Sequence, residues 1–324
     1  MITLGESNPQ RNVWQVSGGP ANRDYSDIFL KYGVALIGPG DAGPWRTGRE
    51  DSEFEGWFVR RFASEVQLGD VFLLRTGISR VCAVGIVASE YSYLPQFDDV
   101  NGWDLQQGRR VRWCELPNAY DFGLSVFGAN PPRLSKLASA EILDYAYRFI
   151  DSPPTNWQSA SLPILPTEEP FLESPPSNLQ DLIAQVHDLA GLYWEKEKFG
   201  SLPTEDELIA HYVVPFLRKL GWPVENIAIK WRHVDVTVFR ALPRSPENCQ
   251  FIIEAKRLGS GVEGALEQAK GYLMDLGIER EIVVTDGIRY RMYEGSNNFA
   301  HIAYANLDRL KLSASNLFAR MSRH

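Results

Sequence analysis

The sequence predicts two domains of different classes, a β-rich N-terminal domain and a mixed α/β C-terminal domain, on three observations. The chain has 324 residues, which is enough for two domains of ordinary size. A stretch dense in proline and serine and without hydrophobic period occupies 151–177, as is typical of an extended, semi-rigid linker. Apolar residues form short strand-like runs before this stretch and recur at helical spacing after it. We therefore expect domains at 1–150 and 178–324.

The N-terminal domain is expected to consist mainly of short strands. VWQVS at 13–17 and DVFLLR at 70–75 have strand character, and a longer apolar run covers 81–93. A Gly-Asp pair at 69–70 supplies a turn ahead of the second strand. The helical spacing of 135–150 predicts a helix that closes the domain.

The C-terminal domain alternates helices and strands. Leucine, isoleucine and valine recur at helical spacing over 178–197, and a second helix over 204–222 is expected to end at Gly221. The elements after it are expected in the order strand, strand, helix, strand and strand, over 227–239, 250–256, 262–277, 281–285 and 288–294. This order predicts an α/β sandwich with a mixed central sheet.

The composition favours a globular protein of the reducing cytoplasm. Apolar residues make up 44% of the chain, and the longest apolar runs have the length of strands, so no membrane span is expected. The first residues lack the basic start and apolar core of a signal peptide. The three cysteines, Cys82, Cys114 and Cys249, form no CxxC pair, which argues against a zinc ribbon and a disulfide framework.

The formal net charge of −8 does not exclude a nucleic-acid partner. Net charge sets solubility and long-range steering, whereas binding needs only a local basic surface. Three short basic stretches offer such surfaces, and solvated faces of a mixed-charge protein explain each of them equally well: Arg109, Arg110 and Arg112; Lys230 and Arg232; Lys256 and Arg257.

An acid and a base stand at the end of the apolar strand 250–256. Because residues two apart on a strand point to the same face, Glu254 and Lys256 share one face. Charges at the tip of a buried strand are costly unless something compensates them. Asp235, flanked by valines on the preceding strand, is a second acid of the same kind. We expect the turn-rich segment 240–248 to bring the two strands side by side.

Two carboxylates from adjacent strands form the hard oxygen site that Mg²⁺ or Mn²⁺ prefers. A metal there lowers the pKa of a bound water and shields a scissile phosphate, while a lysine beside it positions or polarises that water. We therefore predict Asp235 and Glu254 as metal ligands and Lys256 as a catalytic residue. The pattern is short, and an edge strand with a surface ion pair is the alternative.

The second helix offers a further acid. Thr204 and Glu207 form a predicted capping box, which gives Glu207 a structural role and makes it the second choice for the site. Glu205 lies on the face expected to meet the core, where an acid needs a reason, and assistance to the metal site is such a reason. The apolar members of that face are Ile209, Tyr212 and Phe216.

The helix over 262–277 carries Gln268 and Tyr272 four residues apart, hence on one face. A glutamine at this position is suited to orienting a metal-bound water or contacting a phosphate. An exposed glutamine without a role in the site explains the sequence equally well.

Five strings follow one another between 200 and 295: TEDELIAHYVVPFLRKLGW, VDVTVF, FIIEAKR, LEQAKGYLMDLG and VVTDGIRYRMYE. Together they resemble the nuclease domain at the N-terminus of type I restriction motor subunits, a member of the PD-(D/E)XK superfamily. The resemblance implies a nuclease fold and assigns roles residue by residue: Asp235 and Glu254 as metal ligands, Lys256 as the catalytic lysine, Glu205 as the helix acid, and Gln268 with Tyr272 as the Q-x-x-x-Y element.

The sequence departs from that family at two positions. Val234 stands where the family has a proline before the acid, and the turn at Asp286-Gly287 stands where it often has T-N-G. Helicase and translocase motifs are absent from the sequence, so we do not expect a motor subunit.

The N-terminal strings VWQVSGG, LGDVFLLRTG, VCAVGIVASEYSY and GWDLQQGRRVRWCELP, over 12–118, loosely resemble PUA-like barrels, which include EVE domains. The resemblance implies a small barrel that holds a flipped, often modified base in an aromatic cage, where stacking repays the cost of flipping. Packing of the tryptophans in the barrel core is the alternative. The candidates for the pocket and for phosphate contacts are Trp14, Ser17, Trp45, Trp57, Asp70, Arg109, Arg110 and Arg112.

The leading hypothesis is a metal-dependent DNA endonuclease of the restriction or phage-defence type, directed by an N-terminal reader of a modified or flipped base. Tethering the two modules raises their effective concentration at one target. Cutting both strands would need two active sites, which suggests a homodimer. Two alternatives stay open: a non-catalytic nucleic-acid-binding protein with a relict nuclease fold, and an RNA-directed nuclease.

Overall fold

The computed structural model describes residues 11–19, 24–38, 40, 43–45, 58–100, 103–123, 125–154, 157–193, 203–258 and 262–323. The chain forms two compact units. The N-terminal unit comprises Met1–Val100 and Leu105–Thr167, and the C-terminal unit comprises Asn101–Asp104 and Glu168–His324. The main boundary, between Thr167 and Glu168, therefore falls inside the proline-rich segment 151–177.

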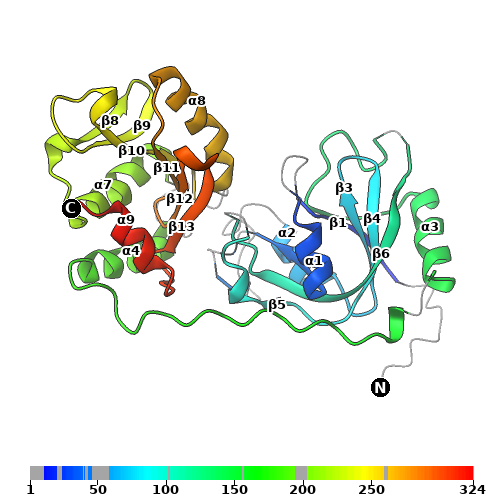
Figure 1. The fold of residues 1–324 in the computed structure, drawn as a ribbon. Helices are drawn as coiled ribbons and strands as arrows, with labels where there is room; N and C mark the ends of the chain where they lie inside the picture. The colour runs from blue at the N-terminus through cyan, green and yellow to red at the C-terminus, as the bar shows by residue number, and fades with distance from the viewer. Residues whose placement is uncertain are drawn as a thin grey trace. The chain divides into compact units, whose positions relative to one another are not determined.

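The N-terminal unit is built on one curled sheet whose spatial order is β2-β6-β4-β3-β1-β7, with β5 paired to β6 (Figure 1). The pair β1/β3 is parallel, and the other pairs are antiparallel. Its strands are β1 Val13–Ser17, β2 Val34–Ile37, β3 Val71–Thr76, β4 Arg80–Val87, β5 Ser92–Tyr93, β6 Gln107–Asp121 and β7 Leu134–Lys136. Its α-helices are α1 Ser26–Tyr32, α2 Phe58–Arg60 and α3 Ala140–Asp151.

The expected helix over 135–150 is only partly correct. Its first residues form β7, because Leu134–Lys136 pair with β1, and the helix begins at Ala140. Helix α3 packs Ile142 and Ala146 against buried residues of β1, β3 and β4. Helices α1 and α2 and strand β2, which lie between β1 and β3 in the chain, were not predicted.

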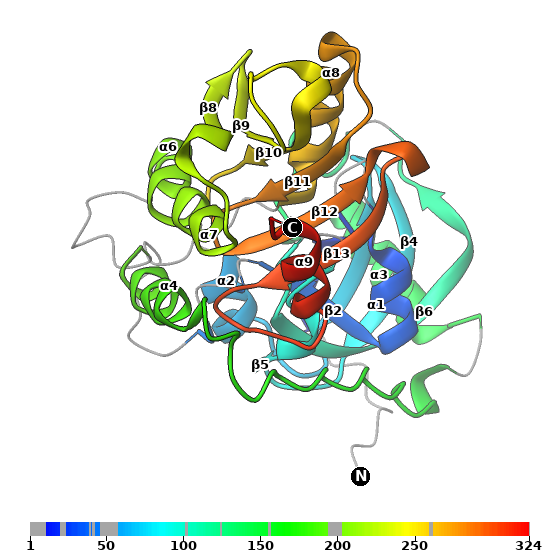
Figure 2. The ribbon, with the colours of Figure 1, turned by 60° about the vertical axis from the view of Figure 1, so that its left-hand side comes forward.

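The C-terminal unit has a second sheet, in the order β13-β12-β11-β10-β9-β8 (Figure 2). The pair β10/β11 is parallel and the remaining pairs are antiparallel, so the sheet is mixed, as predicted. Its strands are β8 Ile227–Trp231, β9 Val234–Phe239, β10 Cys249–Ala255, β11 Glu281–Thr285, β12 Arg289–Glu294 and β13 Ala300–Asn306. Its helices are α4 Gln180–Tyr193, α6 Glu205–Leu208, α7 Val214–Lys219, α8 Leu266–Leu276 and α9 Ala314–Met321.

The single strand expected over 227–239 is instead the hairpin β8–β9. The two residues between its strands, Arg232 and His233, have φ values of 48° and 72°. Positive φ at both central residues makes the tight hairpin turn that sequences usually mark with asparagine and glycine. Arginine and histidine carry no such signal, so the turn was missed.

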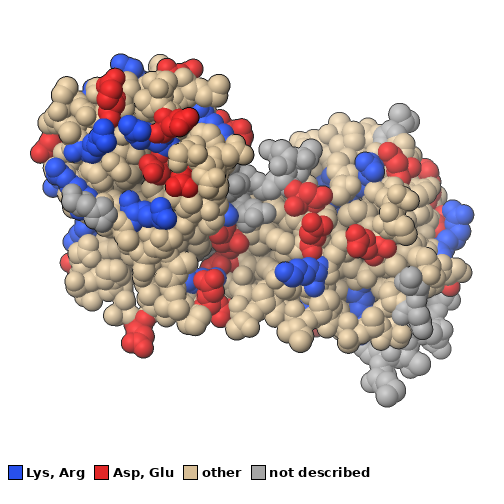
Figure 3. All heavy atoms as spheres, in the orientation of Figure 1, with Lys and Arg blue, Asp and Glu red and all other residues tan. Residues whose placement is uncertain are grey.

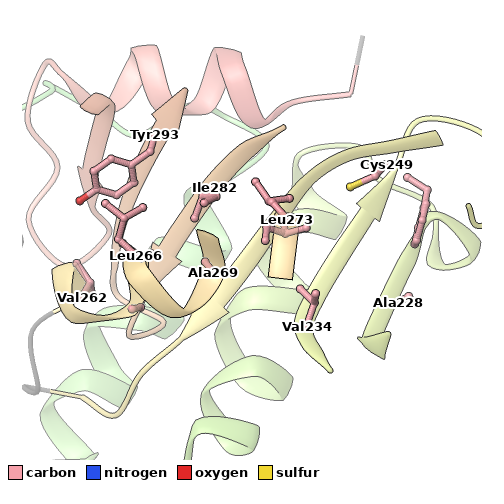
Figure 4. Close-up of a cluster of buried hydrophobic side chains, with 13 residues drawn as sticks. Ala228, Val234, Cys249, Val262, Leu266, Ala269, Leu273, Ile282 and Tyr293 are labelled. Atoms are coloured by element: carbon pink, nitrogen blue, oxygen red, sulfur yellow. The ribbon is translucent and has the colours of Figure 1, made fainter. Parts of the chain in front are cut away.

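Helices cover both faces of this second sheet. On one face, Leu266, Ala269 and Leu273 of α8 pack against Ile252 and Ile282 (Figure 4). On the other face, Phe216 of α7 contacts Tyr290 of β12 and Phe318 of α9 through aromatic rings. Ile252 and Glu254 are two residues apart on β10, so Glu254 lies on the α8 face.

The specific assignments of the first sheet to the PUA-like fold and of the second unit to the PD-(D/E)XK fold remain predictions. Within the part of the chain that the structure describes, no helix combines the length and apolar character needed to cross a membrane.

Candidate active site

A row of charged residues crosses the end of the second sheet. Strands β9 and β10 pair with Ile253 opposite Val236 and Ile252 opposite Thr237. One further step along this antiparallel register places Glu254 opposite Asp235. Side chains directly opposite on neighbouring antiparallel strands have Cβ atoms about 4.5–5.5 Å apart. The fold therefore brings together the two acids predicted from the sequence, on one face of the sheet.

Asp235 is buried, with 5% of its surface exposed, and both carboxylate oxygens are hydrogen-bonded. The backbone amide of Ala255 donates to Oδ2 at 2.8 Å, and Lys230 Nζ donates to Oδ1 at 2.5 Å. The amide contact fixes the side chain of Asp235 against the end of β10, beside Glu254.

Glu254 is more deeply buried, with 1% of its surface exposed. Lys256 Nζ donates to its Oε1 at 3.0 Å, whereas Oε2 is buried without a hydrogen-bond partner among the described residues. Burial raises the pKa of the Glu254 carboxyl from 4.5 to about 7, the ammonium of Lys256 opposes this rise, and the charge of Asp235 adds to it. An additional cation would stabilise the charged form of a carboxylate that is buried in this way.

Lys256 is held in place by a chain of hydrogen bonds from α8. Its Nζ, on a side chain that is 22% exposed, donates to Gln268 Oε1 at 3.0 Å. Gln268 Nε2 in turn donates to Tyr272 Oη at 2.7 Å. Gln268 therefore contacts the lysine itself and positions its ammonium beside Glu254.

Glu205 lies at the start of α6, and its part in the metal site remains a prediction. The capping box of Thr204 and Glu207 is confirmed, but a π-helical turn over Ile209–Val213 follows it. The other members of the predicted face, Ile209, Tyr212 and Phe216, are buried. Glu205 itself is half-buried, and the described residues include no hydrogen bond between it and Asp235, Glu254 or Lys256.

The neighbouring acid, Asp206, reaches the site through Lys230. Lys230 Nζ lies 3.5 Å from Asp206 Oδ1 as well as 2.5 Å from Asp235 Oδ1. The sequence marked Lys230 only as part of a basic stretch. Lys230 stands five residues before Asp235, with the two-residue turn between them. In a hairpin with this turn, that spacing places Lys230 beside Asp235.

The donor set consists of two carboxylates, which are ligands that a hard divalent cation prefers. No group of three or more His, Cys, Asp or Glu side chains suited to a metal occurs among the residues described. Mg²⁺ is commonly bound by one or two carboxylates, with waters and substrate phosphates completing its shell. Asp235 and Glu254, with Oε2 of the latter unpartnered and buried, match that requirement.

The residues expected to bind a base in the N-terminal unit are mostly engaged in its core. Trp14 is buried and donates from Nε1 to Asp70 Oδ2 at 2.8 Å. Asp70 also accepts hydrogen bonds from the backbone amides of Asn12 and Gln67. Trp14 therefore presents no face for stacking, and Asp70 ties β1 to the turn before β3.

The expected phosphate contacts are likewise used internally. Arg109 is fully buried and donates to the backbone carbonyls of Phe62, Ala63 and Ser89. Arg110 donates to the carbonyls of Tyr32, Gly33 and Pro163, and Arg112 donates to that of Ala160. These bonds tie the three arginines to backbone carbonyls of the same unit, and Arg109 is the one that is fully buried.

The three remaining pocket candidates have different outcomes. Ser17 is half-buried and donates from Oγ to the Gly19 carbonyl at 3.0 Å. Trp45 is half-buried, and its indole Nε1 is buried without a partner among the described residues. Trp57 lies outside the described residues.

Charge on the C-terminal unit is mixed. Figure 3 shows Lys and Arg side chains interspersed with Asp and Glu over the face of this unit that it displays. That face therefore carries both signs side by side, as expected from a chain with 33 Lys and Arg and 41 Asp and Glu residues.

Comparison with known proteins gives limited similarity. The model of a domain of unknown function (DUF8426) matches residues 14–122, less than half of the chain. No curated protein matches. A fragment described as the HsdR subunit of a type I restriction enzyme from Vibrio vulnificus YJ016 has a TM-score of 0.26 and 19% identity, over 37% of this chain and 25% of that chain. The chain thus spans about a quarter of that fragment's length.

A second structure, of a protein from Agrobacterium tumefaciens determined by X-ray crystallography, has a TM-score of 0.25 and 18% identity. The similarity covers 44% of this chain and 97% of that chain. The proposal for function therefore rests on the geometry of the site and not on these likenesses.

Proposed function

We propose that this protein is a metal-dependent DNA endonuclease whose active site is formed by Asp235, Glu254 and Lys256. One observation supports this most strongly. Two buried carboxylates face each other across β9 and β10, and one of them has a buried oxygen without a hydrogen-bond partner. An ion pair serving stability alone does not need a second buried acid beside the first.

Each residue has a defined part in hydrolysis of a phosphodiester. Asp235 and Glu254 hold Mg²⁺ or Mn²⁺, which supplies a water of lowered pKa and shields the negative phosphate. Lys256 stabilises the charge that develops on the phosphate oxygens. Gln268 keeps the Lys256 ammonium in place through the 3.0 Å hydrogen bond. Burial raises the pKa of the Glu254 carboxyl to about 7, so a bound cation would displace the proton from those sites that carry one at neutral pH.

The N-terminal unit is proposed to sense a base in the substrate. The support is a polar cluster near the end of β2 and the start of β6. Gln106 Oε1 is buried and unpartnered among the described residues, as is Trp45 Nε1. Trp45 is tied to the same place, because its amide donates to Tyr91 Oη and that hydroxyl donates to Gln107 Oε1. An acceptor and an indole donor beside an aromatic ring suit the edge and face of a base.

A cleavage assay tests the proposal directly. The full chain is incubated with Mg²⁺ or with EDTA on plain DNA, DNA with modified bases, and RNA, beside the variants Asp235→Asn and Glu254→Gln. We expect cutting of DNA that needs the cation and is lost in both variants. Binding without cutting on every substrate would support a non-catalytic binding protein, and preferential cutting of RNA would support an RNA-directed nuclease.

A further inference from the structure

Lys230 belongs to the same row of charges as the two acids. Strands β8 and β9 pair with Ile229 opposite Val236 and Trp231 opposite Val234, so Lys230 lies opposite Asp235. Its Nζ lies 2.5 Å from Asp235 Oδ1. The ammonium of Lys230 is therefore bound to Asp235 Oδ1, one of the oxygens that the proposed metal site needs as a ligand.

The same ammonium has a second acceptor closer to solvent. Asp206 Oδ1, at the start of α6, lies 3.5 Å from Lys230 Nζ. The side chain of Asp206 is 77% exposed and that of Lys230 is 49% exposed, whereas that of Asp235 is 7% exposed. Lys230 can thus exchange a buried partner for an exposed one by a short movement.

The backbone at Lys230 is not the one that lysine prefers. Its φ of 54° lies in the left-handed region, which costs a residue with a side chain about 1–2 kcal/mol. Strain of this kind tends to persist where the surroundings impose it for a reason. The residue with this backbone conformation is the one whose ammonium contacts Asp235.

With both carboxyls ionised, the charges of the site balance without any metal. Asp235 and Glu254 then contribute two negative charges, and Lys230 and Lys256 contribute two positive ones. A divalent cation adds two further positive charges. Lys256 is 22% exposed and held by Gln268, while Lys230 is more exposed and has Asp206 nearby, so Lys230 is the cation free to move.

We propose that Lys230 is a built-in counter-ion that neutralises Asp235 in the metal-free protein and moves to Asp206 when a divalent cation binds. Lys230 thereby competes with the metal and sets the cation concentration at which the site loads. This inference rests on the proposed function, since it requires Asp235 and Glu254 to be metal ligands.

The test is Mn²⁺ binding to the full chain, measured by isothermal titration and by the electron paramagnetic resonance of free Mn²⁺. Lys230→Met removes the competing ammonium, and we expect binding about tenfold tighter, equivalent to about 1.4 kcal/mol. Lys230→Arg keeps the positive charge and is expected to bind like the wild type. Asp206→Asn removes the alternative acceptor and is expected to bind several-fold more weakly.

Lys270→Met is the matched control, because Lys270 pairs with Glu267 on α8 and makes no ion pair with Asp235 or Glu254. Its Mn²⁺ affinity should equal that of the wild type. If the Mn²⁺ affinity of Lys230→Met equals that of the wild type or is lower, the counter-ion role of Lys230 is overturned, whereas the metal site stands. Absence of millimolar binding in both the wild type and Lys230→Met would overturn the metal site and the inference together. If Lys230→Met fails to fold by circular dichroism, the exposed substitution Asp206→Asn decides the question, and unchanged affinity there would overturn the inference.

Discussion

Replacement of Glu254 by glutamine should stabilise the metal-free protein above neutral pH. Burial raises the pKa of the Glu254 carboxyl from 4.5 in the unfolded chain to about 7 in the folded one. The folded state therefore binds more protons than the unfolded state between these values, and the free energy of unfolding falls as pH rises from about 4.5 to about 7. A difference of about 2.5 pKa units corresponds to about 3 kcal/mol, all of it lost by pH 8.

Glu254→Gln keeps the size of the side chain and an oxygen that accepts from Lys256, but it cannot ionise. We expect the variant and the wild type to be similarly stable near pH 4.5. At pH 8 in EDTA the variant should be more stable by about 2–3 kcal/mol, a rise in Tm of roughly 5–10 °C. Addition of Mn²⁺ should reverse the order, because only the wild type binds the cation through this carboxylate.

The assay is thermal and urea unfolding of the full chain at pH 5, 6, 7 and 8, read as the difference between variant and wild type. Other titrating groups are common to both proteins and cancel in this difference. Glu267→Gln is the control, because Glu267 is exposed on α8 and should give a difference near zero at each pH. A flat difference for Glu254→Gln, or a variant less stable than the wild type at pH 8, would refute the reasoning.

Three further outcomes are expected. Lys256→Ala should lower kcat by about 10²–10³-fold, as for other groups that stabilise developing charge, with Mn²⁺ affinity by titration little changed; a purely affinity-based loss would contradict its role. Gln268→Ala should lower kcat on the order of tenfold by releasing the Lys256 ammonium, and Gln268→Glu, which retains an acceptor, should recover part of the rate. Asp70→Asn should lower the free energy of unfolding by about 2 kcal/mol, measured with urea, because the indole of Trp14 and two backbone amides lose a charged acceptor. Loss of nucleic-acid affinity without loss of stability would instead support Asp70 as a pocket residue.

The elements that sequence located well are those in which local pattern and packing agree. Strand β1 has the predicted bounds, because VWQVS has the composition of a strand buried along its length. The capping box before α6 was predictable from two residues, since it is a purely local device. The proximity of Glu254 and Asp235 was predicted from one acid on each of two apolar strands joined by a turn-rich segment.

Other features depended on contacts distant in sequence. Arg232 and His233 are not residues typical of a tight turn. The β8–β9 hairpin and the position of Lys230 opposite Asp235 could therefore not be predicted from the sequence. The π-helical turn at Ile209–Val213, which was not predicted, precedes Pro215, whose missing amide hydrogen disturbs the regular ladder.

The sequence did not show that Trp14 and Arg109, two of the predicted reader residues, are buried in the core. Aromatic and basic residues of a small sheet serve equally well as core and as pocket, and composition does not distinguish them. Trp14 and Arg109 proved to be core because Asp70 and backbone carbonyls satisfy their polar atoms. Gln106, which the sequence did not single out, is recognisable only from its buried and unpartnered oxygen.

The central claim is that the carboxylates of Asp235 and Glu254 share one divalent cation. Anomalous diffraction from crystals of the full chain soaked in Mn²⁺ measures this most directly. The account predicts one strong peak in direct contact with an oxygen of each carboxylate, lost in crystals of Asp235→Asn. Wild-type crystals that hold Mn²⁺ only elsewhere, or that leave Lys230 alone against Asp235 at saturating Mn²⁺, would contradict it.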